Sequence, residues 1–139
     1  MDDVVELGNQ VRLACQRISR RIRYESYIEV APHHYSVLVH LEGSPRTPGE
    51  LADIERVSAP SMTRTINALE EVGHVRRDVD PADGRQKLVS LTPSGKEVLA
   101  RTRVQRDGWM VRHLDGLTPD ELAALREAAV LLTKVANAP

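Results

Sequence analysis

The sequence lacks phenylalanine, has a single cysteine, and contains only 3% aromatic residues among its 139 residues. One cysteine excludes an intramolecular disulfide framework and is typical of proteins in a reducing cytoplasm. There is also no apolar run long enough to cross a bilayer, and no charged-then-apolar leader. We therefore expect a cytoplasmic protein with no membrane partner.

An excess of charge of one sign is also missing. Lys and Arg number 19 against 20 Asp and Glu, which gives a formal net charge of −1 at pH 7. DNA-binding proteins usually carry a basic footprint, so a role in DNA binding would have to depend on where individual cations are placed. The sequence contains no recognisable pairing of a nucleophile with a base, no glycine-rich phosphate loop and no paired carboxylates. It therefore predicts neither an enzyme nor a bound cofactor.

What the sequence does contain is a well-marked helix between Ser58 and Gly73. Ser58 is a good N-cap because its hydroxyl can accept a free backbone N–H of the first turn. Met62, Ile66 and Leu69 recur at the spacing of one buried helix face. Gly73 supplies the left-handed residue that commonly ends a helix.

The opposite side of this helix is polar. Arginine and asparagine pair with guanine and adenine edges, and small hydroxyls near a helix start bind phosphate. The candidate DNA-binding residues of this helix are Ser58, Ser61, Thr63, Arg64 and Asn67. An ordinary solvated face has a similar composition, and Glu71 on the same side favours that simpler interpretation.

The segments on either side of the helix support the DNA-binding interpretation. Upstream, Thr47, Pro48 and Glu50 form a capping-box pattern, which predicts a preceding helix separated from the next by a few residues. Downstream, period-2 alternation predicts two strands joined by a turn at Asp83-Gly84. The apolar residues of these strands are Val75, Val79, Leu88, Val89 and Leu91. A helix-turn-helix followed by a hairpin is a winged helix.

At this point the chain resembles the MarR family of bacterial transcriptional regulators. The run DPADGRQKLVSLT, from Asp80 to Thr92, is similar to the family's wing signature, and SAPSMTRTINALEEVGHV to its recognition helix. The resemblance covers nearly the whole chain. It implies that Arg85 enters the DNA minor groove and that Asp83 orients it, and Lys87 adds a further cation near the DNA. Many members carry a basic residue where this chain has Ala82, so we expect the wing to bind DNA somewhat less strongly.

The expected fold is mainly α with a small β-hairpin (α+β). A winged helix-turn-helix at 31–92 is flanked by dimerisation helices at 1–30 and 93–139. The first helix, from Val4 to about Tyr27, carries an apolar stripe, and Thr118 with Glu121 opens a last helix that carries another. The resemblance implies a two-fold homodimer through these terminal helices; packing of both helices onto a monomer is the alternative. The stripes are Val4, Leu7, Val11, Ala14, Ile18 and Ile22, and Leu122, Leu125, Ala129 and Leu132.

Cysteine and histidine are the two residue types that could indicate redox or metal chemistry here. Cys15 lies roughly where peroxide-sensing members of the family keep a reactive thiol, but Pro32 stands where such sensors have a tyrosine, so a buried, unreactive cysteine is favoured. His33, His34 and His40 lack the spacing of a metal site, so no metal is expected.

The sequence thus predicts a dimeric repressor that binds a pseudo-palindromic operator in double-stranded DNA. A small aromatic or anionic effector would release it, and the cations and rings that could hold it are Arg17, Arg20, Arg21, His33, His34 and Tyr35. The alternative, which is slightly favoured, is that these arginines are solvated or paired with Glu25 and Glu29. Two alternatives stay open: a winged helix that binds a protein partner instead of an operator, and a thiol-based redox sensor acting through Cys15. The operator sequence, the target genes and the identity of the effector are not encoded in any motif.

Overall fold

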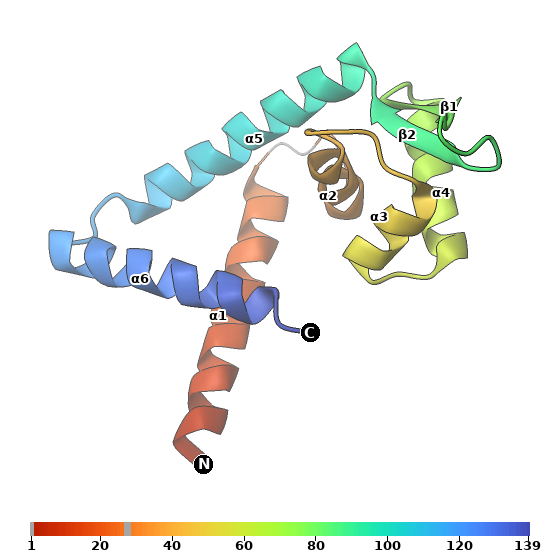
Figure 1. Ribbon diagram of the computed structural model, residues 1–139. Coiled ribbons are helices and arrows are strands. Elements are labelled where there is room, and N and C mark those ends of the chain that lie inside the picture. Colours follow the sequence, from red (N-terminus) through yellow and green to blue (C-terminus); the bar gives the residue numbers. More distant parts are fainter. Residues whose placement is uncertain (1, 27–28) are drawn as a thin grey trace. The chain divides into compact units, whose positions relative to one another are not determined.

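The computed structural model describes residues 2–26 and 29–139 as a mainly helical chain with one small sheet (Figure 1). The chain divides into two compact units, Met1–Arg106 and Asp107–Pro139, with the division inside helix α5. The expected end of the first helix at Tyr27 lies outside the described residues. The elements in order are α1 (Asp2–Glu25), α2 (Pro32–His40), α3 (Pro48–Glu55), α4 (Ala59–Glu71), β1 (Val75–Val79), β2 (Lys87–Leu91), α5 (Pro93–Leu114) and α6 (Pro119–Ala136).

The core of the first unit joins α2, α3, α4, the hairpin and the first turns of α5. The predicted stripe of α4 lies in it, since Met62, Ile66 and Leu69 are at most 2% exposed. Burial of each such side chain is worth about 1.5–3 kcal/mol relative to exposure, so this core fixes how α4 sits on α3. The remaining fully buried apolar side chains are Val37, Leu38, Leu51, Val75, Val89, Val98 and Leu99.

Both ends of α4 form as predicted. The Oγ of Ser58 accepts the backbone N–H of Ser61 at 3.2 Å, and Pro60 lies in the first turn. Gly73 has a φ of 83°, and the N–H of His74 donates to the carbonyl of Leu69 at 2.9 Å. Because a φ of this sign favours glycine, Gly73 ends the helix and turns the chain into β1.

The turn between α3 and α4 was predicted by its length but not by its geometry. Arg56 caps α3 with a φ of 55°, an uncommon value for a residue with a side chain. The N–H of Val57 then donates to the carbonyl of Ala52 at 3.1 Å. The Thr47 cap is confirmed by its acceptance of the Glu50 N–H at 3.1 Å.

The hairpin is antiparallel, with Val75 opposite Leu91 and Val79 opposite Lys87. Its free edge at β2 is partly covered by Arg46, which exchanges two backbone hydrogen bonds with Val89 at 3.0 and 2.8 Å. No sequence pattern predicted this third strand-like contact. It ties the loop before α3 to the wing, so the wing and the helix-turn-helix form one structure.

The terminal helices have the predicted bounds to within a few residues, and the Thr118–Glu121 capping box is complete. Helix α1 has no buried residue within the chain: Val4, Leu7 and Ile18 are 70%, 57% and 42% exposed. Leu125 on α6 is 40% exposed. Part of each predicted apolar stripe is therefore exposed in the single chain, whereas Val11, Ile22, Leu122 and Leu132 are half-buried. Across the described residues, no helix is both long and apolar enough to cross a membrane.

Candidate nucleic-acid interface

The outward face of α4 presents Thr63, Arg64 and Asn67, all exposed, with Ser61 half-buried beside them. The hydroxyl of Thr63 donates to the carbonyl of Ala59 at 3.0 Å. Within the described part of the chain, Arg64 has no hydrogen bond or salt bridge. A guanidinium without an internal partner retains all its donors for an external acceptor.

Asn67 is held differently. Its Oδ1 accepts a hydrogen bond from Nη2 of Arg77 at 2.6 Å, and Nη1 of the same guanidinium lies 3.0 Å from Oε1 of Glu70. Arg77 is itself only partly exposed, and its charge is neutralised by Glu70. The contact fixes the orientation of the Asn67 amide and leaves its nitrogen for an outside acceptor.

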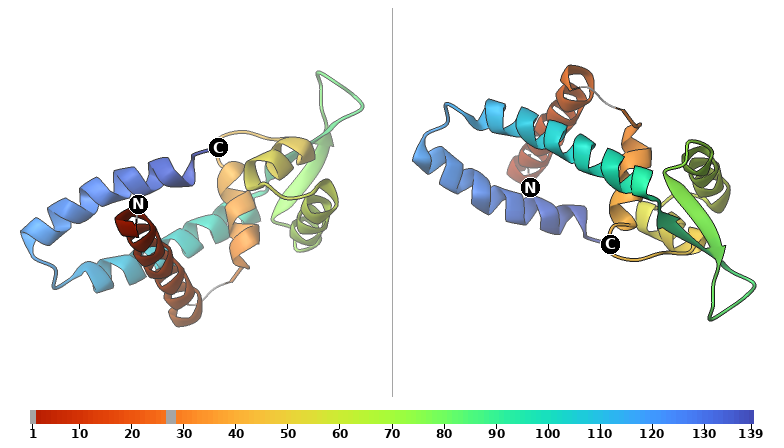
Figure 2. Two further views of the ribbon diagram at one scale, coloured as in Figure 1. Left: turned by 90° about the horizontal axis from the view of Figure 1, so that it is seen from below. Right: turned by 90° about the horizontal axis from the view of Figure 1, so that it is seen from above.

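The wing loop extends beyond the end of the hairpin (Figure 2), and Arg85 in it has a side chain that is 93% exposed. Oδ1 of Asp83 accepts both the backbone N–H of Arg85 at 3.1 Å and its Nε at 3.3 Å. Oδ2 accepts from Nε2 of Gln86 at 3.2 Å. These donors, led by the backbone N–H of Arg85, lower the pKa of Asp83 below its ordinary value, so its carboxylate is ionised at neutral pH.

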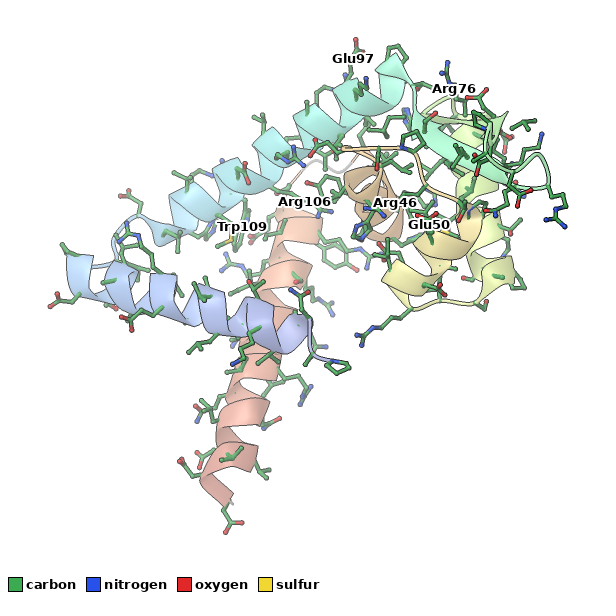
Figure 3. All side chains as sticks on the ribbon, viewed as in Figure 1. Arg46, Glu50, Arg76, Glu97, Arg106 and Trp109 are labelled. Carbon is green, nitrogen blue, oxygen red and sulfur yellow. The ribbon has the colours of Figure 1, made fainter. Side chains whose placement is uncertain are left out.

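Lys87 begins β2 next to this loop and is exposed. Like Arg64, it has no carboxylate partner among the residues that the structure describes. Arg76, in contrast, pairs with Asp78 at 3.0 Å on the surface (labelled in Figure 3). On this surface, Arg64 on the helix face and Lys87 at the base of the wing are thus available to meet phosphate, although the chain carries no net positive charge.

A second feature of this unit is a cavity of about 470 Å³ beside the C-terminal half of α1. The Arg106 guanidinium (labelled in Figure 3) lies over the Tyr35 ring, 4.0 Å from its centroid. Its Nε is buried and has no hydrogen-bond partner among the residues that the structure describes. The cavity is lined by Gln16, Ser19, Arg20, Ile22, Arg23, Tyr24, Pro32 and Arg106.

The predicted effector residues do not all meet at this cavity. Of the six, only Arg20 lines it, and Tyr35 contacts it indirectly through Arg106. Arg21 instead pairs with Glu25 at 3.1 Å. These six residues therefore do not share this one cavity, and an effector site among them stays a prediction. Arg23, Tyr24 and Arg106 were missed, because the sequence does not show which turn of α5 faces α1.

Cys15 is exposed on α1, which corrects the expectation of a buried thiol. The expectation failed because α1 is uncovered within the chain. His40 lies 3.0 Å from Oε1 of Glu55, an atom that also accepts the hydroxyl of Ser36, so this histidine links α2 to α3. No group of His, Cys, Asp and Glu suited to a metal ion occurs within 2–26 and 29–139.

A capped helix with a free arginine on its outer face, joined through a glycine turn to a hairpin with an arginine at its tip, defines a winged helix-turn-helix protein. The model of the MarR family matches residues 29–86. An uncharacterised HTH-type transcriptional regulator of Mycobacterium leprae is 39% identical over 97% of this chain and 96% of its own length.

Solved structures agree with this. A transcriptional regulator protein from Pseudomonas aeruginosa superposes with a TM-score of 0.78 at 28% identity, covering 100% of this chain and 99% of its own. A mutant E. coli MarR complexed with operator DNA has a TM-score of 0.73 at 28% identity, with 96% of both chains covered. The chain belongs to the MarR family of helix-turn-helix transcriptional regulators, and it is a regulator and not an enzyme.

Proposed function

We propose that the protein is a homodimeric repressor that binds a pseudo-palindromic operator in double-stranded DNA. The single observation that carries this proposal is a pair of exposed arginines. Arg64 on α4 has no partner among the described residues, and Arg85 at the wing tip is held by Asp83. A surface that only binds protein has no need of both. The similarity to an E. coli MarR solved with operator DNA supports the same role.

The proposed DNA-binding residues differ in the part of the DNA that they contact. Arg64 and the free amide nitrogen of Asn67 read base edges in the major groove. Ser61, Thr63 and Lys87 bind phosphate, while Ser58 caps the helix that aims them. Arg85 enters the adjacent minor groove, with Asp83 fixing its direction.

Dimerisation is assigned to the terminal regions 1–30 and 93–139, which flank the winged helix at 31–92. The uncovered stripes of α1 and α6 support this assignment, because contiguous exposed apolar surface of this kind marks an interface. Two-fold symmetry then places two copies of α4 in successive major grooves.

The test is a salt-dependent gel shift with the DNA upstream of the protein's own gene and a scrambled duplex of equal length. We expect the upstream duplex to bind about 10³-fold or more tightly than the scrambled one at physiological salt, with both weakening as salt rises. Equal affinity for the two duplexes would support a non-specific or protein-binding winged helix instead.

We also propose that the 470 Å³ cavity beside α1 holds a small anionic aromatic effector. The volume of this cavity lies in the usual range for ligand pockets. Its lining supplies cations from Arg20, Arg23 and Arg106, and the Nε of Arg106 has no hydrogen-bond partner among the described residues. A ligand releases DNA only by preferring a dimer geometry that no longer fits two grooves, and this coupling is reciprocal.

Titration calorimetry with salicylate, with and without the bound duplex, tests the effector. We expect binding that weakens in the presence of DNA and that is lost in Arg106→Gln. Arg17→Gln serves as the matched control, because Arg17 does not line the cavity. Identical salicylate affinity with and without DNA would remove this compound class as an effector.

A further inference from the structure

A smaller cavity of about 250 Å³ lies between the start of α2 and the recognition helix α4. Every side chain that lines it is a hydroxyl, an imidazole or a guanidinium: His33, His34, Ser61, Arg64 and Thr65. No carboxylate is among them. The rings of His33 and His34 meet edge to face with their centroids 4.3 Å apart. We call this cavity the α2–α4 niche.

The start of α2 adds donors to the same place. The N-cap residue is Ala31, which provides no side-chain hydrogen bond to the first turn, and Pro32 follows it. His33 and His34 therefore lie in a first turn whose backbone N–H groups have no capping side chain. These groups and the helix dipole both favour an anion.

Among the residues that line the niche, Arg64 is the one side chain that is always charged. His33 faces His34 on α2, Arg64 faces them from α4, and His74, which follows α4, acts on His34 from that side. The nearby acid Glu29 is already bound to Arg101, at 2.8 and 3.1 Å. Burial, followed by His33 and His74, lowers the pKa of His34, so in the free protein this imidazole is neutral at pH 7.

We propose that the α2–α4 niche binds one backbone phosphate of the DNA whose major groove receives α4, and that binding takes up a proton on His34. The inference rests on the proposed DNA-binding function. It gives the protein a contact with DNA from α2, in addition to those of the recognition helix and the wing.

Three observations favour a phosphate over a free ligand. Arg64 belongs both to the niche and to the outward face of α4, so the niche opens where DNA would lie. Its volume is below the usual range of about 300–1,000 Å³ for small-molecule sites. Its lining offers donors, and phosphate oxygens accept without donating. A phosphate also provides the negative charge that a protonated imidazole beside Arg64 requires.

The test measures fluorescence anisotropy of a rhodamine-labelled duplex of roughly 30 base pairs, taken from the DNA upstream of the gene, between about pH 6 and pH 8. For the parent protein we expect the affinity to rise about three- to tenfold on acidification, as the neutral His34 imidazole becomes protonated with binding. The double variant His33→Gln/His34→Gln keeps polar side chains but cannot take up the proton, so its affinity should change by less than about twofold over this range.

A second readout is the salt dependence at about pH 6. Losing one phosphate contact per subunit should make the slope of log affinity against log salt shallower by about 0.9 per niche. At about pH 8 the slopes of the parent protein and of the double variant should converge. His113→Gln is the matched control, because His113 lies outside the niche, and it should behave as the parent does. The single variant His34→Gln, which leaves the exposed His33 in place, gives the same comparison if the double variant does not fold.

Equal pH and salt dependence in the parent and the double variant, with both still bound to the duplex, would overturn the niche and leave the proposed function standing. If instead the parent binds the upstream and scrambled duplexes equally, the proposed operator binding itself fails, and the niche fails with it.

Discussion

Single residues on the recognition surface differ mainly in what holds them. Arg85 is oriented by two hydrogen bonds to Oδ1 of Asp83, whereas Arg64 has no internal partner among the described residues. A guanidinium that is already held by hydrogen bonds loses little conformational freedom on binding DNA. A guanidinium without such bonds can adapt its donors to a base edge. Replacing Arg64 and replacing Arg85 should therefore change DNA binding in different ways.

Replacing Arg64 with Ala should weaken operator binding by about 1–3 kcal/mol and relax the preference at one base pair in each half-site. The reason is the loss of a bidentate contact to a base. Anisotropy titrations with single-base operator variants measure it. The control is Arg126→Ala, at an exposed position on α6. An Arg64→Ala protein that still discriminates the same base would show that this side chain reads no sequence.

Replacing Arg85 with Ala should weaken binding most on operators with A·T-rich flanks, because the narrow minor groove there has an enhanced negative potential. Asp83→Ala should have a smaller effect, since the cation remains but loses its orientation. Since the pKa of Asp83 is lowered, this orientation is present at neutral pH and is lost only as the pH falls through that lowered value. The same loss on G·C-rich flanks would mean that Arg85 only touches phosphate.

At the scale of elements, the joint between α4, β1 and α5 determines how the recognition helix is held. The N–H of Thr92 donates to the carbonyl of His74 at 3.1 Å, and Nδ1 of His74 lies 3.0 Å from the Ser94 hydroxyl. Gly95 in the first turn of α5 is buried against the same carbonyl. A Cβ added at Gly95 would lie 2.0 Å from that oxygen, which no rotamer change can relieve.

Gly95→Ala should therefore destabilise the fold by about 1–3 kcal/mol or more, because a backbone segment must move to make room. Gly43→Ala is the matched control: nothing lies within 4 Å of a Cβ added there, so its effect should be small. Thermal unfolding followed by circular dichroism compares the two. Equal melting temperatures for both variants would contradict the close approach of α5 to the end of α4.

Much of this element-level structure could be predicted from sequence because it is local. Caps at Ser58 and Thr118, the apolar stripe of α4 and the turn at Asp83 each depend on residues a few positions apart. The Arg46–Val89 bridge and the Gly95 contact could not be predicted, because each joins segments brought together only by the packed core. The residues that line the 470 Å³ cavity could not be predicted for the same reason. Pairing Asp83 with Arg85 succeeded because the two are neighbours in one turn.

For the whole molecule, the uncovered apolar residues of the terminal helices support an obligate dimer. Leu7 and Ile18 on α1 and Leu125 on α6 are 57%, 42% and 40% exposed in the single chain. Such surface is costly to leave in water, so a second copy of the chain is expected to cover it.

Light scattering should therefore find a dimer at low micromolar concentration, and Leu7→Glu or Leu125→Glu should convert it to a monomer or unfold it. Each places a charge where apolar surface is to be buried. Val72→Glu, at a position that is 62% exposed and outside the regions 1–30 and 93–139, provides the comparison. A folded parent monomer at that concentration would contradict an obligate dimer.

The central claim, that a two-fold dimer reads an inverted repeat, is tested most directly by selecting bound duplexes from a random DNA pool. The account predicts enrichment of a pseudo-palindrome whose half-sites lie about 10–10.5 base pairs apart, centre to centre, with specificity lost when Arg64 is replaced by Ala. A pool that emerges from selection with no enriched inverted repeat would contradict it.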